Sequence, residues 1–197
     1  MTAGTGSAVA AAPPLMIDRV DPQHLQALAL LAEAGIEARA LYPGLFAPDS
    51  PAPTNAPLGE REVYLLAWRD GVAVGCGALR RVDAATGEIR RMFVTRSARG
   101  EGVARALLAR LEADAIALGY RGLVLETGAR QKAALALYRS AGWRRIAAYG
   151  PFVSDPTSVC LGKSLRRVST APKARPGAGT SAPAKPRSRA AGRPSSR

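Results

Sequence analysis

The sequence predicts a mixed α/β fold in which a mostly antiparallel sheet contains a parallel β-α-β core flanked by helices. Three apolar runs joined by short turns predict an antiparallel meander. Two Ala- and Leu-rich helical segments follow, and they enclose a short, wholly apolar strand, as expected for a strand covered on both faces. The chain has 197 residues, which suits one domain with a sizeable core.

A short strand and a helix are predicted to open the folded part. Leu15–Ile17 is apolar and begins the strand. Asp21 and Pro22 predict a helix start, with aspartate as the N-cap and proline at the first helical position. Gly35 weakens this helix near its end, and Pro43–Gly59 follows as a long irregular loop. The apolar residues at helical spacing are Leu25, Leu28, Ala32 and Ile36.

The meander occupies the centre of the sequence. Its predicted strands are Val63–Trp68, Val72–Leu79 and Glu88–Val94. Asp70-Gly71 is a strong hairpin signal between the first two strands, and Asp83–Gly87 forms the second turn.

The second half alternates helices and strands. We expect helices at Gly102–Leu118 and Gln131–Ala141 and strands at Leu123–Leu125, Arg144–Tyr149 and Ser158–Leu161. A right-handed crossover through the first of these helices places the flanking strands side by side and parallel.

Most of the net charge of +13 belongs to the C-terminal tail. Arg166–Arg197 has nine basic residues and no acidic residue, whereas the preceding part has nineteen basic and fifteen acidic residues. Because the tail lacks apolar periodicity, we expect 167–197 to be disordered, 1–14 to be flexible and 15–166 to form the domain. The tail is either a solvated extension or a segment attracted nonspecifically to nucleic acid.

Several other classes of protein are disfavoured. No apolar run approaches the length of a membrane span, and Ala8–Ala12 is too short for the core of a signal peptide, so we expect a cytoplasmic protein that does not bind membranes. Cys76 and Cys160 lie in apolar strands and are expected to pack as small hydrophobes. With His24 the single histidine, we expect no metal site.

The glycine-bearing loop Arg99–Ala104 is the most informative motif. A loop of this kind at a helix start presents free backbone N–H groups and the positive end of the helix dipole, which suits a phosphate or pyrophosphate. Val103 and Ala104 stand where a P-loop needs Lys and Ser or Thr. Arg105 stands at the third glycine position of the dinucleotide fingerprint, where its bulk obstructs helix packing. Both of these phosphate sites are therefore disfavoured.

A different motif matches. Arg99-x-x-Gly102-x-Ala104 resembles the Arg/Gln-x-x-Gly-x-Gly/Ala motif of the GNAT superfamily of N-acetyltransferases. The resemblance extends over about residues 15–165, although Gln131 stands where that family usually has Asn. The other segments that resemble the family, in order, are Glu88–Val94, Leu123–Thr127 and Gln131–Trp143.

The resemblance implies a GNAT-like fold and acetyl-CoA as the acyl donor, without a metal. It also implies that the fourth and fifth strands splay apart, and that the pantetheine arm of the coenzyme contacts the backbone of the fourth strand. Main-chain N–H groups of the glycine loop are then expected to hold the pyrophosphate. The implied coenzyme-binding residues are Met92, Phe93, Val94, Arg99, Gly100, Glu101, Gly102, Val103, Ala104, Arg105, Gln131, Ala134 and Tyr138.

Two residues are predicted to be catalytic. The resemblance implies that Tyr138 donates a proton to the sulfur of the coenzyme, and that Glu88 is the base that deprotonates the amine. Glu126, at the end of the next strand, is the alternative base, and water is a third. Because Cys76 and Cys160 have no histidine partner, direct attack in a ternary complex is favoured over a covalent intermediate.

The acceptor is less clearly indicated. Arg90 and Arg91 should alternate across their strand, so that one points toward the acceptor and suits a carboxylated amine, or both are paired on the sheet surface. A small amine, amino-acid-like, is the first expectation and a protein amine the second. The alternative functions are a nucleic-acid-associated protein and a CoA-binding regulator, and homodimerisation stays open.

Overall fold

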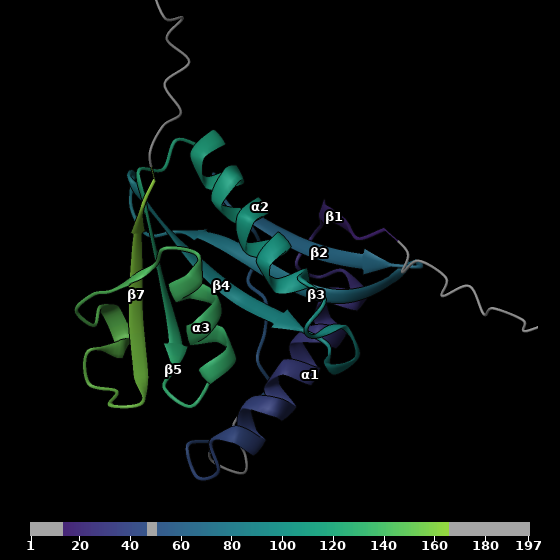
Figure 1. Cartoon of the computed structure of the whole chain (residues 1–197), viewed down its shortest axis with the longest axis horizontal. Helices are drawn as coiled ribbons and strands as arrows, with labels where there is room; N and C mark the ends of the chain where they lie inside the picture. Colours follow the sequence, from purple (N-terminus) through teal and green to yellow (C-terminus); the bar gives the residue numbers. More distant parts are fainter. Residues whose placement is uncertain (1–13, 47–50, 166–197) are drawn as a thin grey trace, which may run out of the picture. The chain divides into compact units, whose positions relative to one another are not determined.

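The computed structural model describes residues 14–46 and 51–165, which are the coloured parts of the ribbon in Figure 1. The basic tail 167–197 and residues 1–13 of the predicted flexible segment lie outside the described residues. Within the described ranges, no helix has both the length and the apolar character needed to cross a bilayer.

The predicted fold class is confirmed. The described residues form a seven-stranded sheet in the order β1-β2-β3-β4-β5-β7-β6, in which β4 and β5 are parallel and the other neighbours antiparallel. The strands are β1 (Met16–Arg19), β2 (Val63–Arg69), β3 (Val72–Arg81), β4 (Thr86–Val94), β5 (Gly122–Gly128), β6 (Arg144–Arg145) and β7 (Ser158–Ser164).

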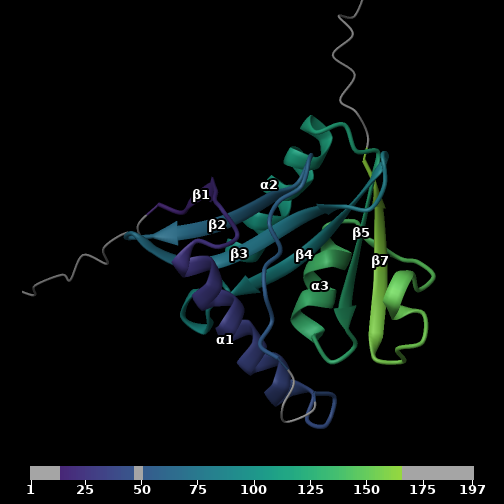
Figure 2. The ribbon, with the colours of Figure 1, turned by 180° about the vertical axis from the view of Figure 1, so that it is seen from behind.

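Helices cover both faces of the sheet. The helix α1 (Leu25–Leu41) lies on one face, and α2 (Val103–Ala117) and α3 (Lys132–Ser140) lie on the other, as Figures 1 and 2 show from opposite sides. Two 3-10 turns, η1 (Arg96–Ala98) and η2 (Gly150–Phe152), precede α2 and β7.

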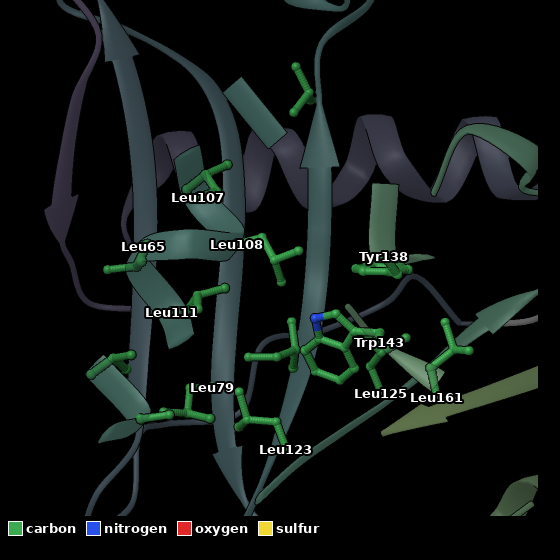
Figure 3. Close-up of a cluster of buried hydrophobic side chains, with 14 of the residues drawn as sticks. Leu65, Leu79, Leu107, Leu108, Leu111, Leu123, Leu125, Tyr138, Trp143 and Leu161 are labelled. Atoms are coloured by element: carbon green, nitrogen blue, oxygen red, sulfur yellow. The ribbon is translucent and has the colours of Figure 1, made fainter. Parts of the chain in front are cut away.

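The main core lies between the sheet and the two helices α2 and α3. Leu107 and Leu111 of α2 are fully buried against strand leucines, and Figure 3 shows this layer together with Trp143. Burying one leucine side chain contributes about 1.5–3 kcal/mol, so this layer supplies much of the stability. A smaller cluster, which includes Leu30 and Leu66, lies on the α1 face.

The parallel pair β4–β5 opens along its length. The two strands pair only from Thr86 with Gly122 to Glu88 with Val124, although both continue beyond this point. The splay expected from the resemblance is therefore confirmed. It leaves main-chain groups of the second half of β4 without a β5 partner.

The predicted start of the first helix is wrong. Its N-cap is His24, whose Nδ1 accepts a hydrogen bond from the Gln26 N–H at 3.2 Å. The Asp21 carboxylate instead accepts the N–H of Gln23, and the Asp21 carbonyl accepts that of His24. Asp21 thus forms a turn of its own before the helix, as aspartate often does.

Gly35 lies within α1, and a Cβ there would lie 3.2 Å from Pro53, so the glycine permits close packing. One strand is shorter than predicted. The strand predicted at Arg144–Tyr149 is limited to Arg144–Arg145. Gly150, with a φ of +51°, begins η2, and Pro151 is its second residue.

Candidate active site

The glycine loop presents an open helix terminus. Gly100 and Gly102 both have φ of +83°, and Gly102 is the N-cap of α2, which has no side-chain cap. A Cβ at either glycine would meet nothing within 4 Å, so the space beside the loop is open. The N–H groups of Val103, Ala104 and Arg105, in the first turn of α2, have no carbonyl one turn earlier to bond. This arrangement fits a pyrophosphate.

The charged side chains around the loop already have partners. The Arg99 guanidinium lies 2.7 Å from a carboxylate oxygen of Glu37 on α1, and its Nε donates to the Val94 carbonyl at 3.0 Å. Glu101 forms an ion pair with Arg69. A phosphate that binds Arg99 therefore has to share the guanidinium with Glu37.

A second helix connects to the loop. Arg105 donates to the Ser140 hydroxyl at 3.1 Å, so the first turn of α2 is joined to the end of α3. Ala134 of α3 is partly buried against the main core, and Gln131 is the N-cap of this helix. Of the predicted coenzyme-binding residues, Gln131 and Ala134 thus lie at the N-terminal end of α3, whereas Tyr138 lies near the C-terminal end that Arg105 reaches.

A cleft of about 320 Å³ lies between α1 and the splayed part of β4. Met92 and Phe93 line it, and Gln131 lines it from the start of α3. The structure therefore brings together three of the predicted coenzyme-binding residues from separate elements. Val94 is buried, and its carbonyl accepts the bond from Arg99.

Tyr138 lies in the main core. Its ring packs against Trp143 with 5.9 Å between the centroids, and only 5 % of the residue is exposed. Burial raises the pKa of Tyr138, and the Glu126 charge raises it further, so the hydroxyl keeps its proton at neutral pH. The hydroxyl forms no hydrogen bond within the described residues, which leaves it able to donate to a ligand.

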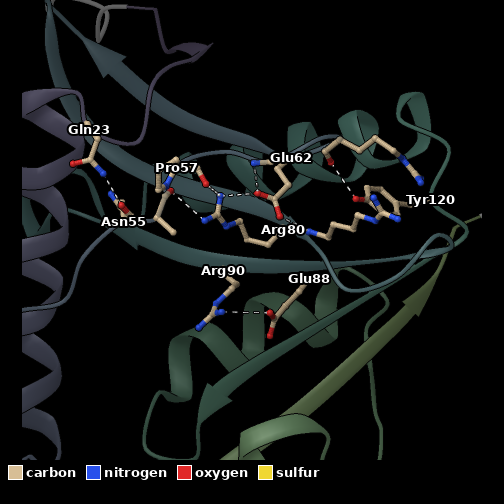
Figure 4. Close-up of polar contacts among 12 residues, drawn as sticks. Gln23, Asn55, Pro57, Glu62, Arg80, Glu88, Arg90 and Tyr120 are labelled. Atoms are coloured by element: carbon tan, nitrogen blue, oxygen red, sulfur yellow. Dashed lines mark hydrogen bonds and ion pairs between the residues drawn. The ribbon is translucent and has the colours of Figure 1, made fainter.

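Glu88 lies on the face of the sheet opposite Tyr138. Its carboxylate accepts a hydrogen bond from the Tyr149 hydroxyl at 2.8 Å and lies 3.7 Å from the Arg90 guanidinium. Figure 4 shows the pair with Arg90. Burial, and then the bond to Glu88, raise the pKa of Tyr149, so this tyrosine acts as a hydrogen-bond donor that holds the glutamate in place.

Glu126 and Asp155 both contact the hydroxyl of Ser158. The Ser158 hydroxyl lies 2.8 Å from Glu126 Oε1 and 2.8 Å from Asp155 Oδ2, yet it has a single hydrogen to donate. The hydroxyl therefore divides this hydrogen between the two carboxylates or donates it to one of them at a time. Bonds from Thr157 lower the pKa of Asp155. Burial raises the pKa of Glu126, and the bond from Ser158 partly offsets this rise. The Ser158 hydroxyl thus occupies one oxygen of Glu126, and Glu126 stays the alternative base to Glu88.

Sequence reasoning missed several residues of this region. Tyr149, Asp155 and Ser158 come from the segment before and at the start of β7, and no motif singled them out. Their side chains meet Glu88 and Glu126 because β7 pairs with β5.

Comparison with known proteins identifies the family. The model of the acetyltransferase (GNAT) family matches residues 33–143, more than half of the chain. The chain belongs to the GNAT family. This match includes β4, the glycine loop, β5 and α3, the elements that carry the predicted coenzyme-binding residues.

Relatives of this GNAT chain bear acetyltransferase names. An IAA acetyltransferase of Azospirillum brasilense is 43% identical over 103 residues, which are 52% of this chain and 67% of that protein. The uncharacterized N-acetyltransferase YsnE of Bacillus subtilis is 35% identical over 109 residues, covering 54% of this chain and 72% of that protein.

Solved structures agree with the GNAT assignment. An acyl-CoA N-acyltransferase structure from Klebsiella pneumoniae has a TM-score of 0.65 and 31% identity, covering 77% of this chain and 98% of that one. A GNAT family acetyltransferase from Elizabethkingia anophelis, solved with acetyl-CoA bound, has a TM-score of 0.56 and 20% identity, covering 77% and 98%. The second likeness concerns the fold alone.

Proposed function

We propose that this GNAT enzyme transfers an acetyl group from acetyl-CoA to the primary amine of a small acceptor, with both substrates bound at once. The observation that carries the proposal is the open, uncapped glycine loop, which follows β4 where this strand separates from β5. Glu88, on the same strand β4, provides a carboxylate held by Tyr149. A helix terminus of this kind suits the pyrophosphate of a coenzyme A.

The donor is assigned to the loop and the splay. The N–H groups of residues 100–104 would hold the pyrophosphate, with Arg99 and Arg105 adding charge. The main chain of Met92–Val94 would hold the pantetheine arm, near Gln131 and Ala134. Acetyl-CoA, when bound, supplies the thioester-activated acetyl group.

The proton transfers are assigned to two side chains. An alkyl amine has a pKa of about 10.4 and must lose a proton before it can attack. Glu88, held by Tyr149, is the proposed acceptor of this proton, directly or through water. Tyr138, which keeps its own proton, is the proposed donor to the departing sulfur as the C–S bond breaks and the C–N bond forms.

Direct transfer is favoured over an acyl-enzyme. Cys76 is buried, and its burial raises the pKa of the thiol to about 11, so the thiolate is scarce at neutral pH. Cys160 is buried as well. Neither thiol is suited to act as a nucleophile.

The decisive experiment is a screen of amines with acetyl-CoA that monitors free coenzyme thiol. We expect amine-dependent thiol release with at least one small amine. Coenzyme binding without thiol release for any amine would support a CoA-binding regulator instead. DNA binding that weakens with salt and is lost on deletion of residues 168–197 would support a nucleic-acid-associated function.

A further inference from the structure

Because of a bulge in β4, the neighbouring residues Arg90 and Arg91 line the same pocket. Strict alternation would send Arg90 and Arg91 to opposite faces of the sheet. Arg91 instead has a φ of +58°, and the β3–β4 register shifts between Cys76 and Ala78, opposite this position. As a result, both arginines line a pocket of about 120 Å³ on the α1 face of the sheet.

Other elements complete the pocket. Tyr64 of β2 and Arg80 of β3 line it, and Thr54 and Asn55 line it from the segment that crosses this face of the sheet. Figure 2 shows this segment, in blue, in front of β3 and β4. The pocket therefore carries three guanidinium groups and no carboxylate of its own.

The three arginines differ in how well their charges are neutralised. Arg80 is held by the Glu62 carboxylate at 2.8 Å and by two backbone carbonyls, as Figure 4 shows in part. Arg90 has Glu88 at 3.7 Å. Arg91 bonds only neutral groups within the described residues, the Asn55 side chain and the Thr54 carbonyl. The pocket thus has an excess of positive charge centred on Arg91.

The direction of the pKa shift of Arg91 agrees with an excess of positive charge in the pocket. Desolvation lowers the pKa of Arg91, and the neighbouring charge of Arg90 lowers it further. Nearby groups that could offset this are the hydroxyl of Tyr64 and the thiol of Cys76, both of which are neutral at pH 7. An anion in the pocket would relieve the repulsion between the guanidinium groups.

A buried hydroxyl provides an independent observation. Tyr64 is 2 % exposed, and its hydroxyl lies near Cys76 and Asn55 but makes no hydrogen bond of acceptable geometry. Leaving a buried hydroxyl unpaired costs about 1–3 kcal/mol. An anionic oxygen bound in the pocket would supply the acceptor that this hydroxyl lacks.

We infer that this pocket, lined by Tyr64, Arg90 and Arg91, is the subsite for a carboxylate group of the acceptor, so that the substrate is a small amine bearing a carboxylate. The inference rests on the proposed acetyltransferase function. Arg90 adjoins both the pocket and Glu88, so an amine at Glu88 and a carboxylate at the arginines can belong to one small molecule. The small volume admits a carboxylate group rather than a nucleotide.

The test compares matched acceptors. Several amino acids, with α- and ω-amino groups, are assayed beside the amines that result from removing their carboxyl groups. We expect kcat/KM to be at least tenfold higher for the carboxylated member of the preferred pair. An equal or opposite preference would overturn the inference while leaving the acetyltransferase function intact.

Two variants locate the effect. Tyr64→Phe removes only the hydroxyl, and we expect kcat/KM for the carboxylated acceptor to fall about fivefold. Arg91→Gln removes the charge, and we expect a fall of at least tenfold. The decarboxylated acceptor should be unaffected in both. The KM for acetyl-CoA should be unaffected in Tyr64→Phe, because Tyr64, unlike Arg91, does not line the cleft beside β4. Arg81→Gln is the control, because Arg81 pairs with Glu60 outside the pocket.

The outcomes separate the two proposals. Variants that slow both members of a pair equally would contradict the carboxylate subsite. If the wild-type chain acetylates no amine, the proposed function fails. Calorimetric titration with the same amino acids would then show whether the pocket binds a carboxylate. Binding to the wild type that is lost in Tyr64→Phe and Arg91→Gln would support an anion site, and absence of binding to the wild type would overturn it.

Discussion

The glycine loop at the start of α2 and the arginine pocket over β3 and β4 present different kinds of polar group. In the loop, consecutive residues expose main-chain N–H groups, and the two glycines leave open space beside them. In the pocket, side chains arrive from β2, β3, β4 and the segment before β2. Main-chain groups depend on backbone conformation, whereas a side-chain pocket depends on the identity of each residue.

This difference predicts how each region responds to substitution. The loop should tolerate changes of side chain except where φ is positive or the open space is filled. The carboxylates and arginines on the α1 face should each have a separate effect on the acceptor.

Gly102→Glu should have the largest effect. The new carboxylate would occupy the open space where the pyrophosphate is proposed to bind, and we expect acetyl-CoA affinity to fall at least a hundredfold, about 2.7 kcal/mol. Gly102→Ala is the matched control, because it carries the same left-handed strain of about 1–2 kcal/mol without the charge. Calorimetry measures both, and normal affinity in Gly102→Glu would remove the loop from the donor site.

Glu88→Gln tests the acceptor side. Loss of a general base costs about a hundredfold or more, and we expect this fall in kcat with little change in acetyl-CoA affinity. Glu60→Gln is the control, since Glu60 is an exposed glutamate paired with Arg81 at 3.7 Å. Steady-state kinetics across pH measure the effect. Undiminished kcat in Glu88→Gln would transfer the role to water or Glu126.

Tyr138→Phe tests whether a core residue also acts in catalysis. The ring packing against Trp143 is preserved, so we expect kcat to fall about tenfold or more while the KM for acetyl-CoA stays unchanged. Tyr120→Phe is the control, because it removes another buried hydroxyl, one that bonds the Arg61 carbonyl far from the loop. Equal turnover in the wild type and Tyr138→Phe at saturating acetyl-CoA would exclude the acid role.

Glu126→Gln should have the smallest effect of these substitutions, and the property that changes is the stability of the fold. Burial raises the pKa of Glu126 above the ordinary value of 4.5, so the folded chain binds this proton more tightly than the unfolded chain. Stability is therefore lost as pH rises from about 4.5 through the folded pKa. We expect the variant to melt at a higher temperature than wild type at pH 8 and at a similar one at pH 4. A difference in melting temperature that does not change with pH would contradict the raised pKa of Glu126.

Much of the fold could be predicted from local patterns. The meander, the two later helices and the parallel strand between them follow from hydrophobic spacing and turn residues, which act over a few residues. The start of α1 could not be predicted, because an aspartate carboxylate accepts backbone N–H groups both at a helix N-terminus and in a turn. In the structure Asp21 accepts the N–H of Gln23 in a turn before the helix. The bulge at Arg91 has no signal in the alternation of β4, since it depends on the pairing with β3.

The glycine loop is the part of the candidate site that could be predicted from the sequence alone. The residues of Arg99–Arg105 are contiguous, so their order sets both the positive φ of the glycines and the open helix start. Only the tertiary structure decided the acceptor side, where the sheet order brings Ser158 to Glu126 and a bulge turns Arg91 toward Tyr64. These contacts join residues far apart in the chain, and sequence spacing carries no information about which strands become neighbours.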